Sequence, residues 1–155
     1  MNTDEYYLDI AEAVSKKSTC LKKQWGAVIV KNNEIISTGY NGAPRKIEDC
    51  VSRGYCLREK SRRNADYCSC LSVHAEMNAI ISAARRDLIG STLYLAGIDT
   101  TNEYVKNPDC CVLCKRLIKN AGIEKVIIRV MPNVWETKYP ENWDTPDVFY
   151  TKGEN

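Results

Sequence analysis

Two short segments, His74-Ala-Glu76 and Cys111-Val-Leu-Cys114, constrain the fold of this chain most strongly. Each segment stands at the expected start of a helix, where the positive end of the helix dipole favours a thiolate over a thiol. The imidazole of His74, the only histidine, and the thiolates of Cys111 and Cys114 can bind one zinc ion only if the fold brings both helix starts together. We therefore expect two neighbouring helices whose first residues meet at one metal ion.

A set of three protein ligands indicates a catalytic metal site. A structural zinc site closes with four protein ligands, whereas a catalytic site keeps one position for water, and zinc lowers the pKa of that water from about 15.7 towards about 7. Glu76 lies two residues from His74, so its carboxylate can reach the edge of the site without binding the metal and can transfer a proton. Cys110 remains an alternative to Cys111, although only Cys111 has the two-residue spacing to Cys114 that suits chelation.

The chain has eight cysteines. In an exported protein such a number suggests disulfides, whereas in a reducing compartment it suggests thiolates and metal. The N-terminus, Met-Asn-Thr-Asp-Glu-Tyr-Tyr, lacks the basic start and the apolar stretch of a signal peptide. We therefore expect a cytoplasmic protein whose cysteines bind metal.

Hydrophobic periodicity predicts a single α/β domain over residues 1–155. The expected elements, in chain order, are a helix over about 4–18, strands over 25–31 and 34–40, a helix over 74–87, a strand over 91–96, a helix over 111–120 and a strand over 125–130. This order predicts three α/β/α layers around one mixed sheet, with the last two strands parallel across a helix. The remaining segments are an irregular cysteine-containing insertion at about 41–72, a polar excursion within 95–110 and an elaborated tail from about 131, for which no regular structure is expected.

Composition argues against two classes of partner. Lys and Arg total 22 against 20 acidic residues, a net charge of +2, and this near-balance argues against a protein that coats nucleic acid. The longest apolar runs, such as Trp25-Gly-Ala-Val-Ile-Val30, are far too short to cross a bilayer. We expect neither a nucleic acid nor a membrane as partner.

The two metal-binding segments match the H-x-E and P-C-x-x-C signature of zinc nucleobase deaminases, except that Cys110 stands at the proline position. Residues 5–130 resemble the deoxycytidylate (dCMP) deaminases of the cytidine deaminase superfamily. The resemblance is carried by His74-Ala-Glu-Met-Asn-Ala-Ile80, by Lys115-Arg-Leu-Ile-Lys-Asn-Ala-Gly-Ile123, and by Thr38-Gly-Tyr-Asn-Gly-Ala-Pro44 followed by Cys50 and Cys56-Leu-Arg58.

The resemblance implies a cytidine-deaminase-like fold and hydrolysis of dCMP to dUMP and ammonia, supplying dUMP for thymidylate synthesis. Activated water would attack C4 of the base, and Glu76 would protonate N3 and then the departing amine. Asn41 would face the sugar. The resemblance also implies a homo-oligomer, often a hexamer, that dCTP activates and dTTP inhibits, with residues 39–44 near the effector region.

By the same resemblance, Cys20, Cys50, Cys56 and Cys70 match positions of a second, structural zinc, and Cys68 is an alternative to Cys70 for the fourth place. Four thiolates would close a tetrahedral site and hold the coreless insertion in place. The alternative is that these cysteines are free thiols or small buried apolar residues.

Two questions stay open from the sequence. The cation that binds a substrate phosphate is one of several Lys and Arg residues, among them Lys22, Lys23, Arg45, Lys46, Arg53 and Arg58. The alternative functions are a deaminase acting on cytidine, deoxycytidine, CMP or tRNA adenosine, and a zinc-stabilised binding module without activity, which would not need Glu76.

Overall fold

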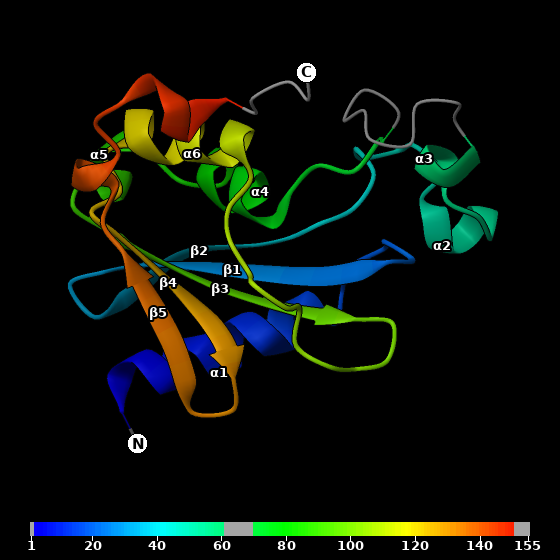
Figure 1. Ribbon diagram of the computed structural model, residues 1–155, viewed down its shortest axis with the longest axis horizontal. Coiled ribbons are helices and arrows are strands. Elements are labelled where there is room, and N and C mark those ends of the chain that lie inside the picture. Colours follow the sequence, from blue (N-terminus) through cyan, green and yellow to red (C-terminus); the bar gives the residue numbers. More distant parts are fainter. Residues whose placement is uncertain (1, 61–69, 151–155) are drawn as a thin grey trace.

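The computed structural model describes residues 2–60 and 70–150 (Figure 1). A five-stranded sheet in the order β2-β1-β3-β4-β5 forms the centre of the molecule. Its strands are β1 (Lys23–Lys31), β2 (Glu34–Tyr40), β3 (Thr92–Asp99), β4 (Lys125–Met131) and β5 (Val134–Lys138). β3 and β4 pair in parallel and the other neighbours pair antiparallel, which confirms the mixed sheet.

Helices cover both faces of this sheet (Figure 1). Helix α1 (Thr3–Ser15) packs on one face, and α4 (Ala75–Ile81), α5 (Arg85–Leu88) and α6 (Val112–Ala121) lie on the other. Successive strand residues point to opposite faces, so β1 sends Val28 into the core under α1 and Ala27 and Ile29 into the core under α4 and α6. The three-layer α/β/α fold expected from the sequence is therefore confirmed.

Glycine lets α4 approach the sheet closely. A Cβ atom at Gly39 in β2 would lie 2.3 Å from the carbonyl oxygen of Ala75 and 2.4 Å from the amide nitrogen of Ala79. Real side chains do not tolerate such contacts, so only glycine permits this approach of backbone to backbone. The first turn of α4, which carries Glu76, is thereby held directly against β2.

The prediction of one continuous helix over 74–87 is wrong, because the structure has two shorter helices there. The chain forms α4, turns at 82–84 and starts again as α5, because Ala84 adopts an extended conformation with φ −74° and ψ 144°. The turn lets Leu88 bury in the core, where it is 4% exposed. Packing of this side chain outweighs the helix propensity of the intervening alanine residues.

The insertion and the tail contain more regular structure than expected. The insertion forms two four-residue helices, α2 (Cys50–Arg53) and α3 (Leu57–Lys60). The tail forms β5 and two 3-10 helices, η2 (Pro140–Asn142) and η3 (Pro146–Phe149), which lie against α6. No helix within the described residues is long and apolar enough to cross a bilayer.

Candidate active site

The fold brings the three expected metal-binding side chains together. His74 is the residue immediately before α4, and Cys111 holds the same position before α6, on the same face of the sheet. Nδ1 of His74 lies 3.3 Å from Sγ of Cys111 and 3.4 Å from Sγ of Cys114. Within residues 2–60 and 70–150, this is the only group of three or more His, Cys, Asp or Glu side chains whose ligand atoms all lie within 4.8 Å of one another.

The surroundings of these atoms favour a thiolate at Cys111. The thiol of Cys114 and the ring of His74 hydrogen-bond to the Cys111 sulfur and lower the pKa of Cys111 to about 4. The backbone N–H of Cys114 donates to the same sulfur over 3.4 Å. The contact with Cys111 and burial raise the pKa of Cys114. Two thiols that share a proton in this way release it when a metal ion binds.

Glu76 lies in the first turn of α4 and is only 6% exposed. Burial raises the pKa of its carboxyl group. The carboxylate is not a member of the group of metal-binding atoms. It is therefore placed beside the candidate metal site, where a buried carboxyl group can accept and release a proton.

A cavity of about 320 Å³ opens over these side chains. Its wall includes His74, Glu76 and Cys111, together with Trp25 of β1 and Asn41, the residue after β2. Small-molecule sites are typically concave, with a few convergent polar groups on a mostly apolar wall. The volume is at the lower end of the range of about 300–1,000 Å³ for such sites.

Asn41 is 6% exposed, and its side chain is held by the backbone of β1. Its Oδ1 accepts from the backbone N–H of Trp25 at 2.8 Å, and its Nδ2 donates to the carbonyl of Lys23 at 2.9 Å. These two bonds fix the amide in one orientation. Asn41 therefore faces the cavity with a preset arrangement of donor and acceptor.

The amino-acid sequence matches one family over most of its length. Residues 1–130 match the model of the cytidine and deoxycytidylate deaminase zinc-binding region. The chain belongs to this family. It is 39% identical over 128 residues to the deoxycytidylate deaminase of Mycobacterium phage D29, an alignment that covers 80% of this chain and 91% of that protein.

Two further relatives show the breadth of the match. The deoxycytidylate deaminase of Schizosaccharomyces pombe is 33% identical over 133 residues, which cover 84% of this chain but only 38% of the yeast protein. Among solved structures, the dCMP deaminase of cyanophage S-TIM5 in complex with dCMP and dUMP superposes with a TM-score of 0.57 at 27% identity. That superposition covers 84% of this chain and 82% of the phage chain.

The donor set of the deaminase fits zinc. One imidazole nitrogen and two thiolate sulfurs are ligands that zinc prefers. Separations of 3.3 and 3.4 Å between the nitrogen and the sulfurs match ligands that share one ion, given zinc–ligand distances of about 2.0–2.3 Å. Cys110, the sequence alternative to Cys111, does not belong to the group.

The four cysteines expected to hold a second zinc lie near the same cavity. Cys20, Cys56 and Cys70 line its wall, and burial and the nearby Cys20 and Cys56 raise the pKa of Cys50. Within the described part of the chain, no three of these four sulfur atoms all lie within 4.8 Å of one another, whereas the ligand atoms of His74, Cys111 and Cys114 do. Cys68 lies outside the described residues. A second zinc site stays a prediction.

The structure narrows the candidates for a phosphate-binding cation. Lys22, Lys23 and Arg58 line the cavity, and the ammonium of Lys22 is ion-paired with Glu59. The others lie elsewhere: Arg45 and Lys46 line a different hollow beside β2 and α4, and Arg53 contacts Glu48, Cys50 and Tyr55.

Sequence reasoning missed two residues of the site, Trp25 and Asp109. Trp25 lines the cavity and packs on Gly97, where a Cβ atom would lie 2.4 Å from the indole ring. Asp109 also lines the cavity. The pairing of Trp25 with Gly97 depends on the register of β1 against β3, which no local sequence signal specifies.

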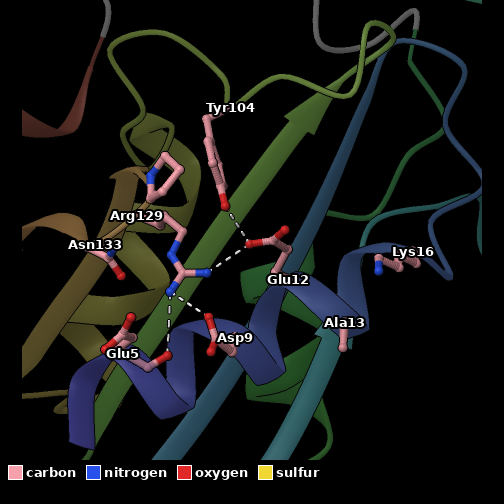
Figure 2. Close-up of a pocket in the computed structure, with 9 residues that line it drawn as sticks. Glu5, Asp9, Glu12, Ala13, Lys16, Tyr104, Arg129 and Asn133 are labelled. Carbon is pink, nitrogen blue, oxygen red and sulfur yellow. Dashed lines mark hydrogen bonds and ion pairs between the residues drawn. The ribbon is translucent and has the colours of Figure 1, made fainter. Parts of the chain in front are cut away.

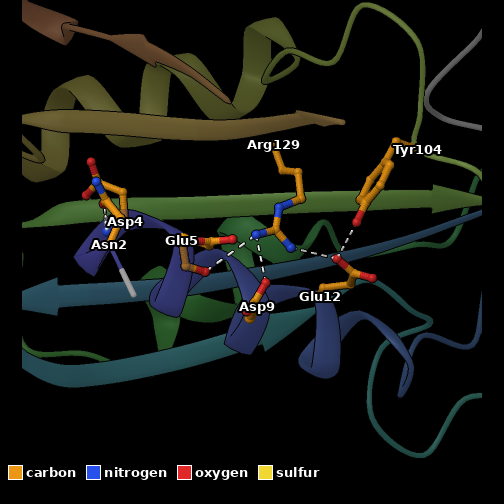
Figure 3. Close-up of polar contacts among 7 residues, drawn as sticks. All are labelled: Asn2, Asp4, Glu5, Asp9, Glu12, Tyr104 and Arg129. Atoms are coloured by element: carbon orange, nitrogen blue, oxygen red, sulfur yellow. Dashed lines mark hydrogen bonds and ion pairs between the residues drawn. The ribbon is translucent and has the colours of Figure 1, made fainter. Parts of the chain in front are cut away.

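The opposite face of the sheet carries a separate polar cluster (Figure 2). Arg129, only 4% exposed, forms ion pairs with Asp9 at 2.7 Å and Glu12 at 2.8 Å. Glu12 also accepts a hydrogen bond of 2.8 Å from the hydroxyl of Tyr104 (Figure 3). Tyr104 belongs to the excursion between β3 and α6, so the cluster fastens that excursion and β4 to α1.

Proposed function

We propose that this deaminase catalyses the hydrolysis of dCMP to dUMP and ammonia, and so supplies dUMP for thymidylate synthesis. The observation that carries the proposal is the meeting of His74, Cys111 and Cys114 beside the buried carboxyl of Glu76 in one cavity. Two comparisons support dCMP as the substrate. The phage D29 relative, matched over 91% of its length, is a deoxycytidylate deaminase, and the cyanophage protein was crystallised with dCMP and dUMP.

In this proposal His74, Cys111 and Cys114 hold the zinc ion. When bound, zinc supplies a water molecule whose pKa lies near 7, and hence a hydroxide at neutral pH. Glu76 accepts the proton of that water and passes it to N3 of the base. The oxygen adds to C4. Glu76 then takes the proton of the new C4 hydroxyl and delivers it to the amino nitrogen, so that the bond from C4 to nitrogen breaks, ammonia leaves and the oxygen stays as the C4 carbonyl.

Substrate binding is assigned to the rest of the cavity wall. The fixed amide of Asn41 meets the sugar of the nucleotide. The indole of Trp25 supplies a large apolar surface for the nucleoside, as aromatic side chains do in many ligand sites. We assign the 5′-phosphate to Lys23, because its ammonium has no ion pair within the described residues, whereas Lys22 is paired with Glu59 and Arg58 also has an interaction partner.

The assembly and regulation of the enzyme belong to the same proposal. We propose a single-domain enzyme that assembles as a homohexamer and acts in the cytoplasm. We also propose that dCTP activates it and dTTP inhibits it. A hollow of about 520 Å³ supports a nucleotide effector, because residues 39, 40 and 42–44 line it together with the cationic Arg45 and Lys46. The second zinc is assigned to Cys20, Cys50, Cys56 and Cys70.

A substrate panel tests this function. Ammonia release is measured with dCMP, CMP, deoxycytidine, cytidine and a tRNA stem-loop, each with and without dCTP and dTTP. We expect dCMP to have the highest kcat/KM. Turnover of cytidine without turnover of dCMP would contradict the substrate assignment, and no turnover of any compound by zinc-loaded protein would indicate a binding module.

A further inference from the structure

The indole of Trp25 lies directly over Gly97. The two residues are paired across strands β1 and β3, and a Cβ atom at Gly97 would overlap Cε3 and Cζ3 of the indole and lie 2.7 Å from its Cδ2. All three carbons belong to the six-membered ring of the indole. A side chain at Gly97 would displace that ring, so the glycine lets the indole rest against the sheet.

Trp25 lies next to the residues assigned to the phosphate and the sugar. Lys23 and Trp25 are two residues apart in β1, so their side chains point to the same face, and both line the cavity that holds His74 and Cys111. The amide of Asn41 accepts from the backbone N–H of Trp25 at 2.8 Å and donates to the carbonyl of Lys23 at 2.9 Å. A nucleotide with its base at the metal-binding group and its phosphate at Lys23 therefore carries its sugar past both Asn41 and Trp25.

The two residues beside the sugar differ in chemistry. Asn41 offers polar atoms, whereas the indole of Trp25 offers a carbon surface. Deoxyribose has a methylene at C2′, and ribose has a hydroxyl there. A methylene is stabilised when it is buried against carbon, whereas a hydroxyl buried there loses its hydrogen bonds to water and gains none.

We propose that Trp25, resting on Gly97, is the specificity-determining residue that selects the deoxyribose of dCMP over the ribose of CMP, because its indole packs against C2′ of the bound nucleotide. Gly97 acts through Trp25, by keeping the ring low enough to leave room for the sugar. This role rests on the proposed deaminase function and on its assignment of the phosphate to Lys23 and of the sugar to Asn41.

Steady-state kinetics with dCMP and CMP test the role. In the wild type, kcat/KM should favour dCMP by about 10²-fold, the discrimination that a hydrophobic pocket achieves against one added hydroxyl. Trp25→Thr keeps a β-branched side chain suited to a strand but gives the 2′-hydroxyl a hydrogen-bond partner and access to water, so the preference should fall to about tenfold or less. An unchanged preference in Trp25→Thr would overturn the role.

Trp135→Thr is the matched control. Trp135 is another partly buried tryptophan in a strand, but it packs against the core under α1, on the face opposite the cavity. The control should lower the melting temperature and leave the preference for dCMP within about twofold of the wild type, since its cost is one of packing alone. An equal loss of preference in Trp135→Thr and Trp25→Thr would overturn the specificity role.

Gly97→Ala tests the support beneath the ring while Trp25 is kept. The backbone of Gly97 lies outside the left-handed region, so the added methyl group acts on the indole and not on the chain conformation. KM for dCMP should rise about tenfold in the wild-type background, because the ring is pushed into the cavity, and by less than about twofold in Trp25→Thr, where no ring is displaced. Equal rises in the two backgrounds would overturn the coupling of Trp25 to Gly97.

Calorimetric binding of the product nucleotides supplies a readout that does not depend on turnover. dUMP and UMP differ only in the 2′-hydroxyl, so the wild type should bind dUMP at least about tenfold more tightly, and Trp25→Thr should bind the two within about threefold of each other. Equal Kd values for dUMP and UMP in the wild type overturn the inference even if the protein turns over dCMP. A wild type inactive on every nucleotide overturns the proposed function and leaves the role of Trp25 to this measurement.

Discussion

At the scale of single residues, the site depends on side chains whose chemistry is specified by local spacing. His74 immediately precedes α4 and Glu76 lies in the first turn of that helix; Cys111 immediately precedes α6 and Cys114 lies in its first turn. Such spacing can be read from the sequence because it needs no knowledge of tertiary structure. The contact of Trp25 with Gly97 joins distant segments, so the sequence alone does not reveal it.

Replacing the carboxyl group of Glu76 tests its assignment as the proton-transfer group. Glu76→Gln keeps the shape of the side chain but cannot accept the proton, so kcat for dCMP should fall by about 10²–10⁴. Zinc content and melting temperature should stay close to the wild type. The same change at the exposed Glu103 is the control and should leave kcat unaffected. Unchanged turnover by Glu76→Gln would refute the assignment.

Removing the ammonium of Lys23 tests the phosphate contact. Lys23→Ala should raise KM for dCMP about tenfold, or about 1.4 kcal/mol. This is below the range of about 1.5–3 kcal/mol for hydrogen bonds to charged groups, because solvent weakens an exposed contact. Turnover of deoxycytidine, which has no phosphate, should be unaffected. Lys17→Ala, at an exposed lysine outside the cavity, is the control. An equal loss with both substrates would exclude a phosphate-specific role.

At the scale of elements, the hydrophobic pattern predicts strands β1 to β4 and helices α1 and α6. The structure differs from the prediction where tertiary packing determines the local conformation. The buried runs of β1 and β3 point to strands because they are short and continuous. The sequence does not predict β5, although Pro132-Asn133 before it is a turn signal and Asn133 has a φ of 60°. Its burial alternates weakly, and only pairing with β4 makes it a strand.

Replacing Arg129 tests how the elements on the α1 face of the sheet are joined. Arg129→Met removes ion pairs to Asp9 and Glu12 and leaves those two partly exposed carboxylates unpaired. We expect a loss of about 2 kcal/mol in the free energy of unfolding, less than the 3–5 kcal/mol of a fully buried pair because solvent reaches both acids. Urea unfolding measures this. The kcat should be unchanged, because the cluster lies on the face opposite the cavity; a tenfold lower kcat would contradict that separation.

Replacing Trp143 tests whether packing of the tail on α6 stabilises the fold. It is 9% exposed and belongs to the same hydrophobic cluster as Cys114 and Ile118. Trp143→Ala should cost about 3 kcal/mol, which corresponds to a melting temperature about 8 °C lower for a chain of this size. Tyr139→Ala, at an exposed aromatic residue of the tail, should change it little. Similar melting temperatures for both variants would show that the tail is not part of the core.

At the scale of the whole molecule, the fold serves to bring two helix starts to one point. α4 and α6 are separated in the chain by α5 and β3, and both lie on the sheet face opposite α1. The parallel pairing of β3 with β4 requires a crossover, and α6 is that crossover. The sequence therefore predicts the convergence of His74 with Cys111 and Cys114 once its α/β order is recognised, whereas the shape of the cavity depends on packing that the order does not specify.

A crystal structure of the zinc-loaded enzyme, with the metal located by anomalous scattering, tests the central claim most directly. We predict one zinc ion about 2.3 Å from Sγ of Cys111 and Cys114 and about 2.0–2.1 Å from Nδ1 of His74, with water as the fourth ligand. A fourth protein ligand on that ion, or a zinc ion on Cys111 and Cys114 that does not bind His74, would contradict the account.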